Sequence, residues 1–143
     1  MRKTPLDDLK LHVKFKLSAL WTALMFCYIY GDYFGLYVPG QLKGMLEGQG
    51  PVGPTTQGSL AGTALLLAIP GVMVFLSLVS PPVLSRCLNL LFGTLYTLIM
   101  LATMPGAWVF YILLGVIEVI LTGSIVWYAW TWPRTAGMQR EAP

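Results

Sequence analysis

Charged residues are scarce in this chain, and their scarcity determines the solvent that it needs. Only 10% of the 143 residues are Asp, Glu, Lys or Arg, whereas 56% are hydrophobic and the mean hydropathy is +0.69. A soluble domain carries about 25% charged residues. This composition excludes an ordinary water-soluble domain. We therefore predict that residues 1–143 form a single domain surrounded by lipid.

Metal-ligating and nucleophilic residues are also few. The one histidine, His12, precedes the first apolar stretch, and the two cysteines, Cys27 and Cys87, fall at different expected depths. These residues cannot build a zinc site, and a disulfide needs Cα atoms within roughly 7 Å. The sequence has no phosphate-binding glycine loop and no basic face with interleaved aromatic residues. We expect no metal, no cofactor and no nucleic-acid partner, and without catalytic residues an enzyme has little support.

Four apolar stretches are each long enough to cross a bilayer, which takes about 20 residues. They are residues 15–37, 58–79, 83–104 and 107–130. None alternates with period two, so a membrane barrel is excluded and helices remain. Asp7 and Asp8 interrupt the basic N-terminus and no signal-cleavage pattern follows, so the first stretch is interpreted as a retained helix. The predicted fold is an all-α membrane protein, a bundle of four transmembrane helices.

The distribution of basic residues predicts the orientation of these spans. An even number of spans places both termini on one side of the membrane, and the opposite side then holds only Lys43 of the nine Lys and Arg residues. The other eight are Arg2, Lys3, Lys10, Lys14, Lys16, Arg86, Arg134 and Arg140. By the positive-inside rule, both termini are cytoplasmic and the protein is a multi-pass protein of the inner (plasma) membrane.

The connections and the second span carry three further signals. The outer loop, residues 38–57, has apolar residues spaced for a short interfacial helix beside a possible Lys43–Glu47 ion pair. Gly58-x-x-x-Gly62 permits close helix approach, either at a dimer interface or within the bundle, and with three other spans available we favour the bundle. Pro70, in mid-span, predicts a kink.

Two carboxyl residues, Asp32 and Glu118, fall within the predicted hydrocarbon region. A charge at the centre of a span costs about 2.5 to 3.5 kcal/mol on insertion scales. Glu118 shares a helical stripe with Tyr111 and Thr122, and Asp32 shares one with Tyr28. At about 1.5 Å per residue the two acids differ in depth by about 7 Å, so we expect a shared polar pocket in the outer half.

The partners expected for these acids are hydroxyl and amide groups, because no Lys, Arg or His lies deep in a span. The third span offers an amide and a phenol at helical spacing. The candidate pocket therefore comprises Glu118, Asp32, Tyr111, Thr122, Tyr28, Asn89 and Tyr96. Two interpretations stay open. The acids line a site for a proton, a cation or a polar head group, or they are hydrogen-bonded pins that fix helix register.

Three segments together carry a family resemblance: "YGDYFGLYVPG", "TTQGSLAGTALLLAIPGVMV" and "FYILLGVIEVILTGSIVWYAWTWP". From about Lys14 to Pro133 the chain resembles an uncharacterised family of small bacterial four-span membrane proteins, a domain of unknown function. The matching positions are Asp32, Pro39-Gly40, Thr56-Gln57-Gly58, Ile69-Pro70, Asn89, Glu118 and residues 127–130. The resemblance implies the architecture and a role for Asp32 and Glu118, but no reaction. The family often has acids where this chain has Val38 and Ala68, which implies that part of a shared activity is missing here.

Two functional hypotheses follow from these observations. In the first, the bundle binds or transports a small solute, a proton, a lipid or a quinone at the acid-lined pocket between the first and fourth helices. In the second, it is a non-catalytic accessory or assembly subunit of a larger membrane complex, and its acids are structural. The expected partners are the lipid bilayer and either further copies of the chain or that larger complex.

Overall fold

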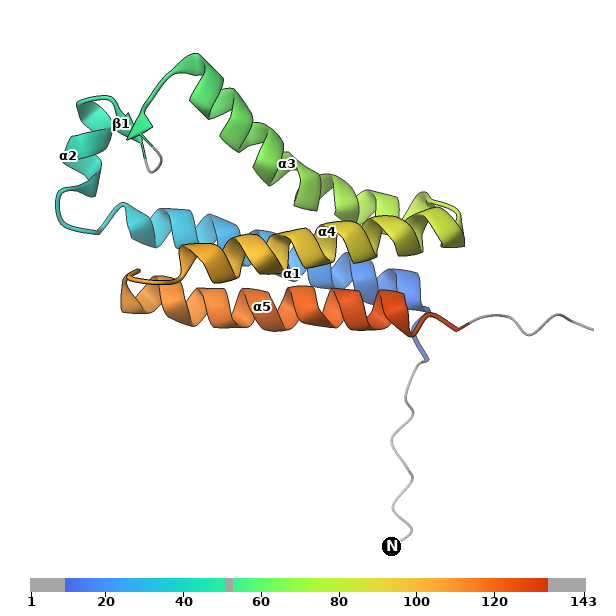
Figure 1. Ribbon diagram of the computed structural model, residues 1–143. Coiled ribbons are helices and arrows are strands. Elements are labelled where there is room, and N and C mark those ends of the chain that lie inside the picture. Colours follow the sequence, from blue (N-terminus) through green and yellow to red (C-terminus); the bar gives the residue numbers. More distant parts are fainter. Residues whose placement is uncertain (1–9, 51–52, 134–143) are drawn as a thin grey trace, which may run out of the picture.

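The computed structural model describes residues 10–50 and 53–133, and long helices dominate them (Figure 1). The long helices are α1 (Val13–Gly35), α3 (Gln57–Val79), α4 (Pro82–Thr103) and α5 (Val109–Trp130). The all-α prediction is confirmed. By length and composition α3, α4 and α5 can each cross a membrane, whereas α1 is less apolar and does not reach the same level. These three helices indicate a multi-pass membrane protein.

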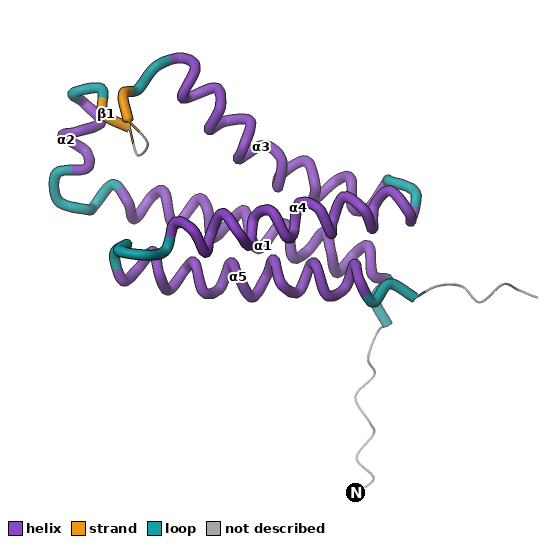
Figure 2. The backbone as a smooth tube through the Cα atoms, in the orientation of Figure 1, coloured by secondary structure: helices purple, strands orange, loops and turns teal. Residues whose placement is uncertain are grey.

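The loop between α1 and α3 holds the short helix α2 (Gln41–Leu46) and a small hairpin, β1 (Gln49–Gly50) and β2 (Gly53–Pro54). The strands are antiparallel, with Gly50 opposite Gly53. The short helix was predicted, and its Lys43–Glu47 ion pair is present at 3.9 Å, with both side chains largely exposed. The hairpin was not predicted. Figure 2 shows α2 and the hairpin beyond the end of α1 and beside the start of α3.

The long helices separate at one end of the molecule. α1 packs along α5 and α3, and α4 packs along α5, whereas α3 has far fewer contacts with α4. Figure 1 shows why: the first half of α3 runs diagonally away from the other helices, and its second half turns back alongside them. The α-helix continues through the buried Pro70, which lies between these halves. The predicted bend therefore coincides with Pro70.

The buried core lies mainly on the side of Pro70 away from α2. Its members come from all four long helices and are Leu17, Trp21, Leu24, Met73, Tyr96 and Ile125. Many large apolar side chains instead point outward, including Leu65, Phe75 and Val109, each more than 60% exposed. This distribution fits an apolar solvent around the helices.

Close helix approach occurs at different glycines from those predicted. A Cβ on Gly62 would meet nothing within 4 Å, and a Cβ on Gly58 would meet only the Thr56 hydroxyl. The expectation that this pair packs within the bundle is therefore wrong for the described chain. The tight contact lies at Gly93 of α4, where a Cβ would meet Val126 Cγ2 of α5 at 3.0 Å. Spacing alone did not reveal which face of α3 would be covered.

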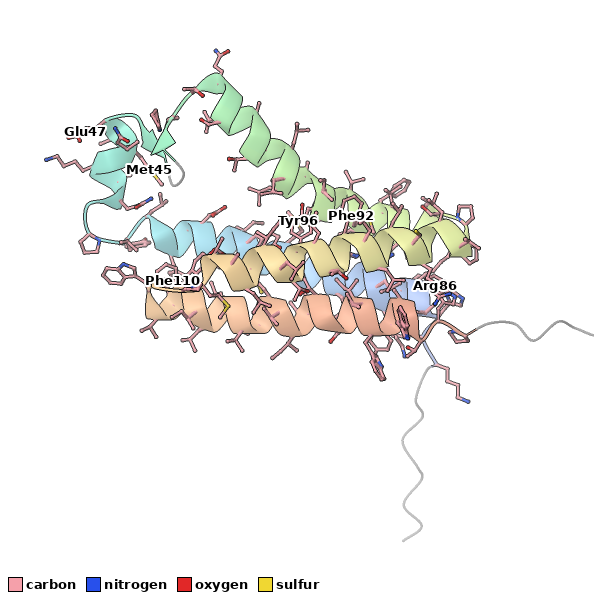
Figure 3. All side chains as sticks on the ribbon, in the orientation of Figure 1. Met45, Glu47, Arg86, Phe92, Tyr96 and Phe110 are labelled. Carbon is pink, nitrogen blue, oxygen red and sulfur yellow. The ribbon has the colours of Figure 1, made fainter. Side chains whose placement is uncertain are left out.

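Basic side chains cap helices at the end of the molecule opposite α2. Lys14 Nζ donates to the carbonyls of Leu78 (3.1 Å) and Ser80 (2.6 Å), at the end of α3. Arg86 Nε donates to Ala129 O (3.1 Å), near the end of α5, and Figure 3 shows Arg86 at this end. Carbonyls left unpaired at helix C-termini favour such cations. The local charge excess thus has a structural use.

Candidate functional site

A cavity of about 620 Å³ occupies the space where α3 diverges from α1 and α4. All four long helices contribute to its wall, and the α2–hairpin loop contributes Met45, Gln49, Gly50, Gly53 and Thr55. The α3 residues of the wall all precede Pro70, and the last of them is Leu67. Figure 3 shows Met45 extending from α2 toward the space between α1 and α3. The cavity therefore lies on the α2 side of the bend.

Five of the seven predicted pocket residues line this cavity. They are Glu118, Asp32, Tyr111, Tyr28 and Tyr96. Asn89 and Thr122 are not part of its wall. The structure thus brings the two acids to one cavity, together with the three predicted tyrosines. That these residues bind a ligand stays a prediction.

Glu118 is the more deeply buried of the two carboxyl groups that line the cavity. Its side chain comes from the middle of α5 and is only 4% exposed. Within the described chain, its Oε2 atom has no hydrogen-bond partner. Buried polar side chains nearly always have such a partner, because desolvation without one is costly. A carboxyl group that only fixed helix register would be expected to have one too.

Asp32 differs from Glu118 in its surroundings. It lies three residues before the end of α1, is exposed, and lines the same cavity. Lining residues of the described chain include no Lys, Arg or His, so neither acid has a cation in the wall. The cavity wall therefore contains one buried acid, Glu118, and one exposed acid, Asp32 on α1.

Tyr96 connects the cavity to the bend in α3. Its hydroxyl donates to the carbonyl of Leu66, four residues before Pro70. In a regular helix that carbonyl would accept from the N–H of residue 70, which proline lacks. The Tyr96 hydroxyl therefore takes the place of the missing donor and ties α4 to α3. Its ring also packs edge-on to Trp21, with ring centroids 6.1 Å apart, and lies 6.3 Å from the Tyr28 ring.

The hydroxyl groups of Tyr111 and Thr122 have different surroundings. Tyr111 Oη donates to Thr103 Oγ1 (3.0 Å), which joins α5 to α4 at the cavity wall. Thr122 Oγ1 donates to the backbone carbonyl of Glu118 (2.8 Å) and lies 2.7 Å from Thr97 Oγ1. Thr122 thus supports the helical turn that carries Glu118, without reaching the cavity itself.

Asn89 belongs to a separate buried network near the core. Its Oδ1 accepts from Trp21 Nε1 (2.7 Å) and from Ser77 Oγ (3.2 Å), and its Nδ2 donates to Ser85 O (2.8 Å). These bonds join α1, α3 and α4, and the Asn89 side chain is fully buried. Its polar groups are occupied by the protein, so the structure gives Asn89 a packing role away from the cavity.

Several wall residues escaped the sequence analysis. Met45 and Gln49 come from the loop between α1 and α3, and their spacing in the sequence did not indicate that they would line a cavity. Ser59 and Thr63 of α3 also line the cavity, and their i, i+4 spacing was visible in the sequence. That spacing marked one polar face of α3 rather than a helix-packing surface. No group of three or more His, Cys, Asp or Glu that could hold a metal ion occurs within residues 10–50 and 53–133.

Fold and cavity together define a helical, multi-pass membrane protein with an acid-lined internal space. The chain belongs to DUF6326, a family of unknown function, whose family model matches residues 8–138. This match confirms the resemblance to an uncharacterised family. Comparison with curated proteins and with solved structures gives no match.

Proposed function

We propose that this chain is a four-span protein of the inner membrane, with both termini cytoplasmic, that binds a small ligand in its acid-lined cavity. The 23 residues of α1 would extend about 35 Å, enough for a hydrocarbon core of about 30 Å. The clustering of Lys14, Lys16 and Arg86 at the end opposite α2 supports cytoplasmic placement of that end.

One observation carries the binding proposal: the Glu118 carboxyl group is buried beside the cavity with its Oε2 unpartnered by the described protein. An ionisable residue inside a membrane span is functional by default, since its insertion is costly. The cavity volume of about 620 Å³ falls within the range of about 300–1,000 Å³ typical of ligand sites. A ligand that reaches Glu118 would provide the hydrogen-bond partner that the described residues do not.

Chemical labelling tests this proposal directly. N,N′-Dicyclohexylcarbodiimide is an apolar reagent that modifies carboxyl groups in apolar surroundings. We expect it to modify Glu118 in the purified protein, as located by peptide mass spectrometry. Leu67→Trp should fill the cavity and reduce the modification several-fold, because Leu67 is part of the wall.

The matched control is Leu65→Trp, the same change on the same helix. Leu65 is 70% exposed and is not a wall residue, so the labelling of Glu118 should not change. Failure of the reagent to reach Glu118 in the wild-type protein would contradict an accessible binding cavity. Equal labelling of the Leu65 and Leu67 variants would show that access does not run through this space.

A second candidate function, an accessory subunit of a larger membrane complex, is favoured by a different observation. Gly58 and Gly62 have no helix against them within the described chain, and small residues at this spacing suit helix–helix contact. Gly62→Leu would then disrupt a complex isolated from native membranes and leave Glu118 labelling unchanged. Retention of every co-purifying partner by this variant would remove the support for that candidate.

A further inference from the structure

We propose that the cavity selects an organic cation with a hydrophobic body, such as an apolar amine or a quaternary ammonium or phosphonium ion. This inference rests on the proposed function, because it names the ligand class of the same cavity. Three features carry it: the sign of the charge in the wall, the aromatic faces and the apolar remainder.

The charge argument starts from the two acids. Glu118 and Asp32 line the cavity, and its described wall contains no basic residue. Three basic residues of the described chain lie away from the wall: Lys14 and Arg86 cap helix ends opposite α2, and Lys43 lies beside Glu47 with 81% of its side chain exposed. An ionised carboxyl group at the cavity therefore has no counter-ion among the described wall residues. A cationic ligand would supply that charge, whereas an anionic head group would be repelled.

The aromatic side chains favour the same sign of charge. Tyr28, Tyr96 and Tyr111 all line the cavity, and the rings of Tyr28 and Tyr96 are inclined by 40° at a centroid distance of 6.3 Å. Aromatic faces attract cations, most strongly where water is excluded. Because the Tyr96 hydroxyl is bonded to Leu66 O, its ring is held in one orientation. This fixed ring adds an aromatic surface without adding a positive charge.

The rest of the wall determines the kind of cation. Leu60, Leu67, Ile99 and Leu114 provide apolar surface on three helices. A small inorganic cation is held by several ligands close together, and residues 10–50 and 53–133 contain no group of three or more His, Cys, Asp or Glu that could hold a metal ion. A neutral quinone would fit the apolar surface but would leave the charge of the two acids uncompensated. A ligand with an apolar body and a dispersed positive charge matches both the apolar residues and the two acids of the wall.

A pair of probe ions of nearly equal shape and opposite charge separates charge selection from simple partitioning. Tetraphenylphosphonium and tetraphenylborate are each measured against the purified full-length protein by equilibrium dialysis, with detergent-matched blanks. We expect saturable binding of the phosphonium and binding of the borate weaker by about tenfold or more. Tetraphenylphosphonium should also protect Glu118 from the carbodiimide.

Charge-removing variants locate the selectivity. Glu118→Gln should weaken phosphonium binding by about tenfold or more, since the buried carboxylate loses its charge but keeps its shape. Asp32→Asn should weaken it less, because Asp32 is exposed. The matched control is Glu47→Gln, which removes an exposed carboxylate outside the cavity wall and should leave binding unchanged.

Several results would overturn the inference. Equal affinity for the two probe ions in the wild-type protein would refute it without any variant, so the test does not depend on how Glu118→Gln folds. Protection of Glu118 by the neutral probe decylubiquinone, but not by tetraphenylphosphonium, would also refute it and leave the proposed binding function standing. If the carbodiimide never reaches Glu118, the proposed function itself fails.

Discussion

Removing the Tyr96 hydroxyl tests the contact that joins the cavity to the bend in α3. In the structure this hydroxyl donates to Leu66 O, the carbonyl that Pro70 leaves without a helical donor. Tyr96→Phe keeps the ring, which is 3% exposed in the core, and removes only the donor. The change therefore leaves a single backbone carbonyl unsatisfied while packing against Trp21 is kept.

The expected cost can be bounded from two directions. A buried acceptor left unsatisfied costs about 1–3 kcal/mol in proteins generally. Interhelical hydrogen bonds within membranes contribute about 0.6 kcal/mol on average and about 1.7 kcal/mol at most. We expect Tyr96→Phe to lower the free energy of unfolding by about 1–1.5 kcal/mol. Reversible unfolding in mixed detergent micelles, followed by tryptophan fluorescence, measures this difference.

A double-mutant cycle with Pro70→Ala isolates the mechanism. Alanine restores the N–H of residue 70 as a donor for Leu66 O, so the Tyr96 hydroxyl becomes dispensable there. Tyr96→Phe should then cost less than about 0.5 kcal/mol in the Pro70→Ala background. Tyr111→Phe is the control, since its hydroxyl bonds to Thr103 rather than to α3 and should be additive with Pro70→Ala. An equal cost of Tyr96→Phe in both backgrounds would refute the reasoning.

Two further predictions concern packing away from the cavity. Asn89→Ala leaves Trp21 Nε1 without its acceptor and should destabilise the protein by about 2 kcal/mol in the same unfolding assay, while phosphonium binding by the folded variant is retained. Loss of binding with unchanged stability would instead indicate that Asn89 contributes to the ligand site. Gly93→Ala places a Cβ 3.0 Å from Val126 Cγ2 and should cost about 1–3 kcal/mol, whereas Gly62→Ala, with open space around it, should be neutral or stabilising. Similar unfolding energies for the two glycine variants would contradict the assigned helix contacts.

The helices and the two acids follow from local properties of the sequence. Hydrophobic length marks the helices, and a carboxyl residue such as Glu118 stands out in an apolar stretch whatever its neighbours are. The prediction that Asn89 and Tyr96 lie on one face of their helix was also correct, since both residues are buried. Depth was not predictable in the same way. Seven residues separate these two by about 10 Å along the axis, which places one in the core network and the other at the cavity.

The remaining features depend on how helices meet, and no periodicity encodes that. The open space around Gly62 and the presence of Met45 in the cavity wall depend on how α3 and the loop are arranged in three dimensions. The sequence showed Pro70, but it did not show that Tyr96 of another helix would donate to the carbonyl of Leu66. The hydrogen bonding around Pro70 thus depends on Tyr96, which lies 26 positions further along the chain.

The bend in α3 also separates two kinds of polar interior. In one the polar side chains are hydrogen-bonded to one another, and in the other a carboxyl oxygen has no partner within the described chain. Beyond Pro70, α3 lies against the other helices, and Ser77 joins Asn89 and Trp21 in a network whose polar atoms are paired. Before Pro70, α3 departs, and Glu118 of α5 is left facing a space that the chain does not fill. Pro70 thus lies at the change from the packed half of α3 to the half that borders the cavity beside Glu118, and the Tyr96 hydroxyl joins α4 to α3 near this point.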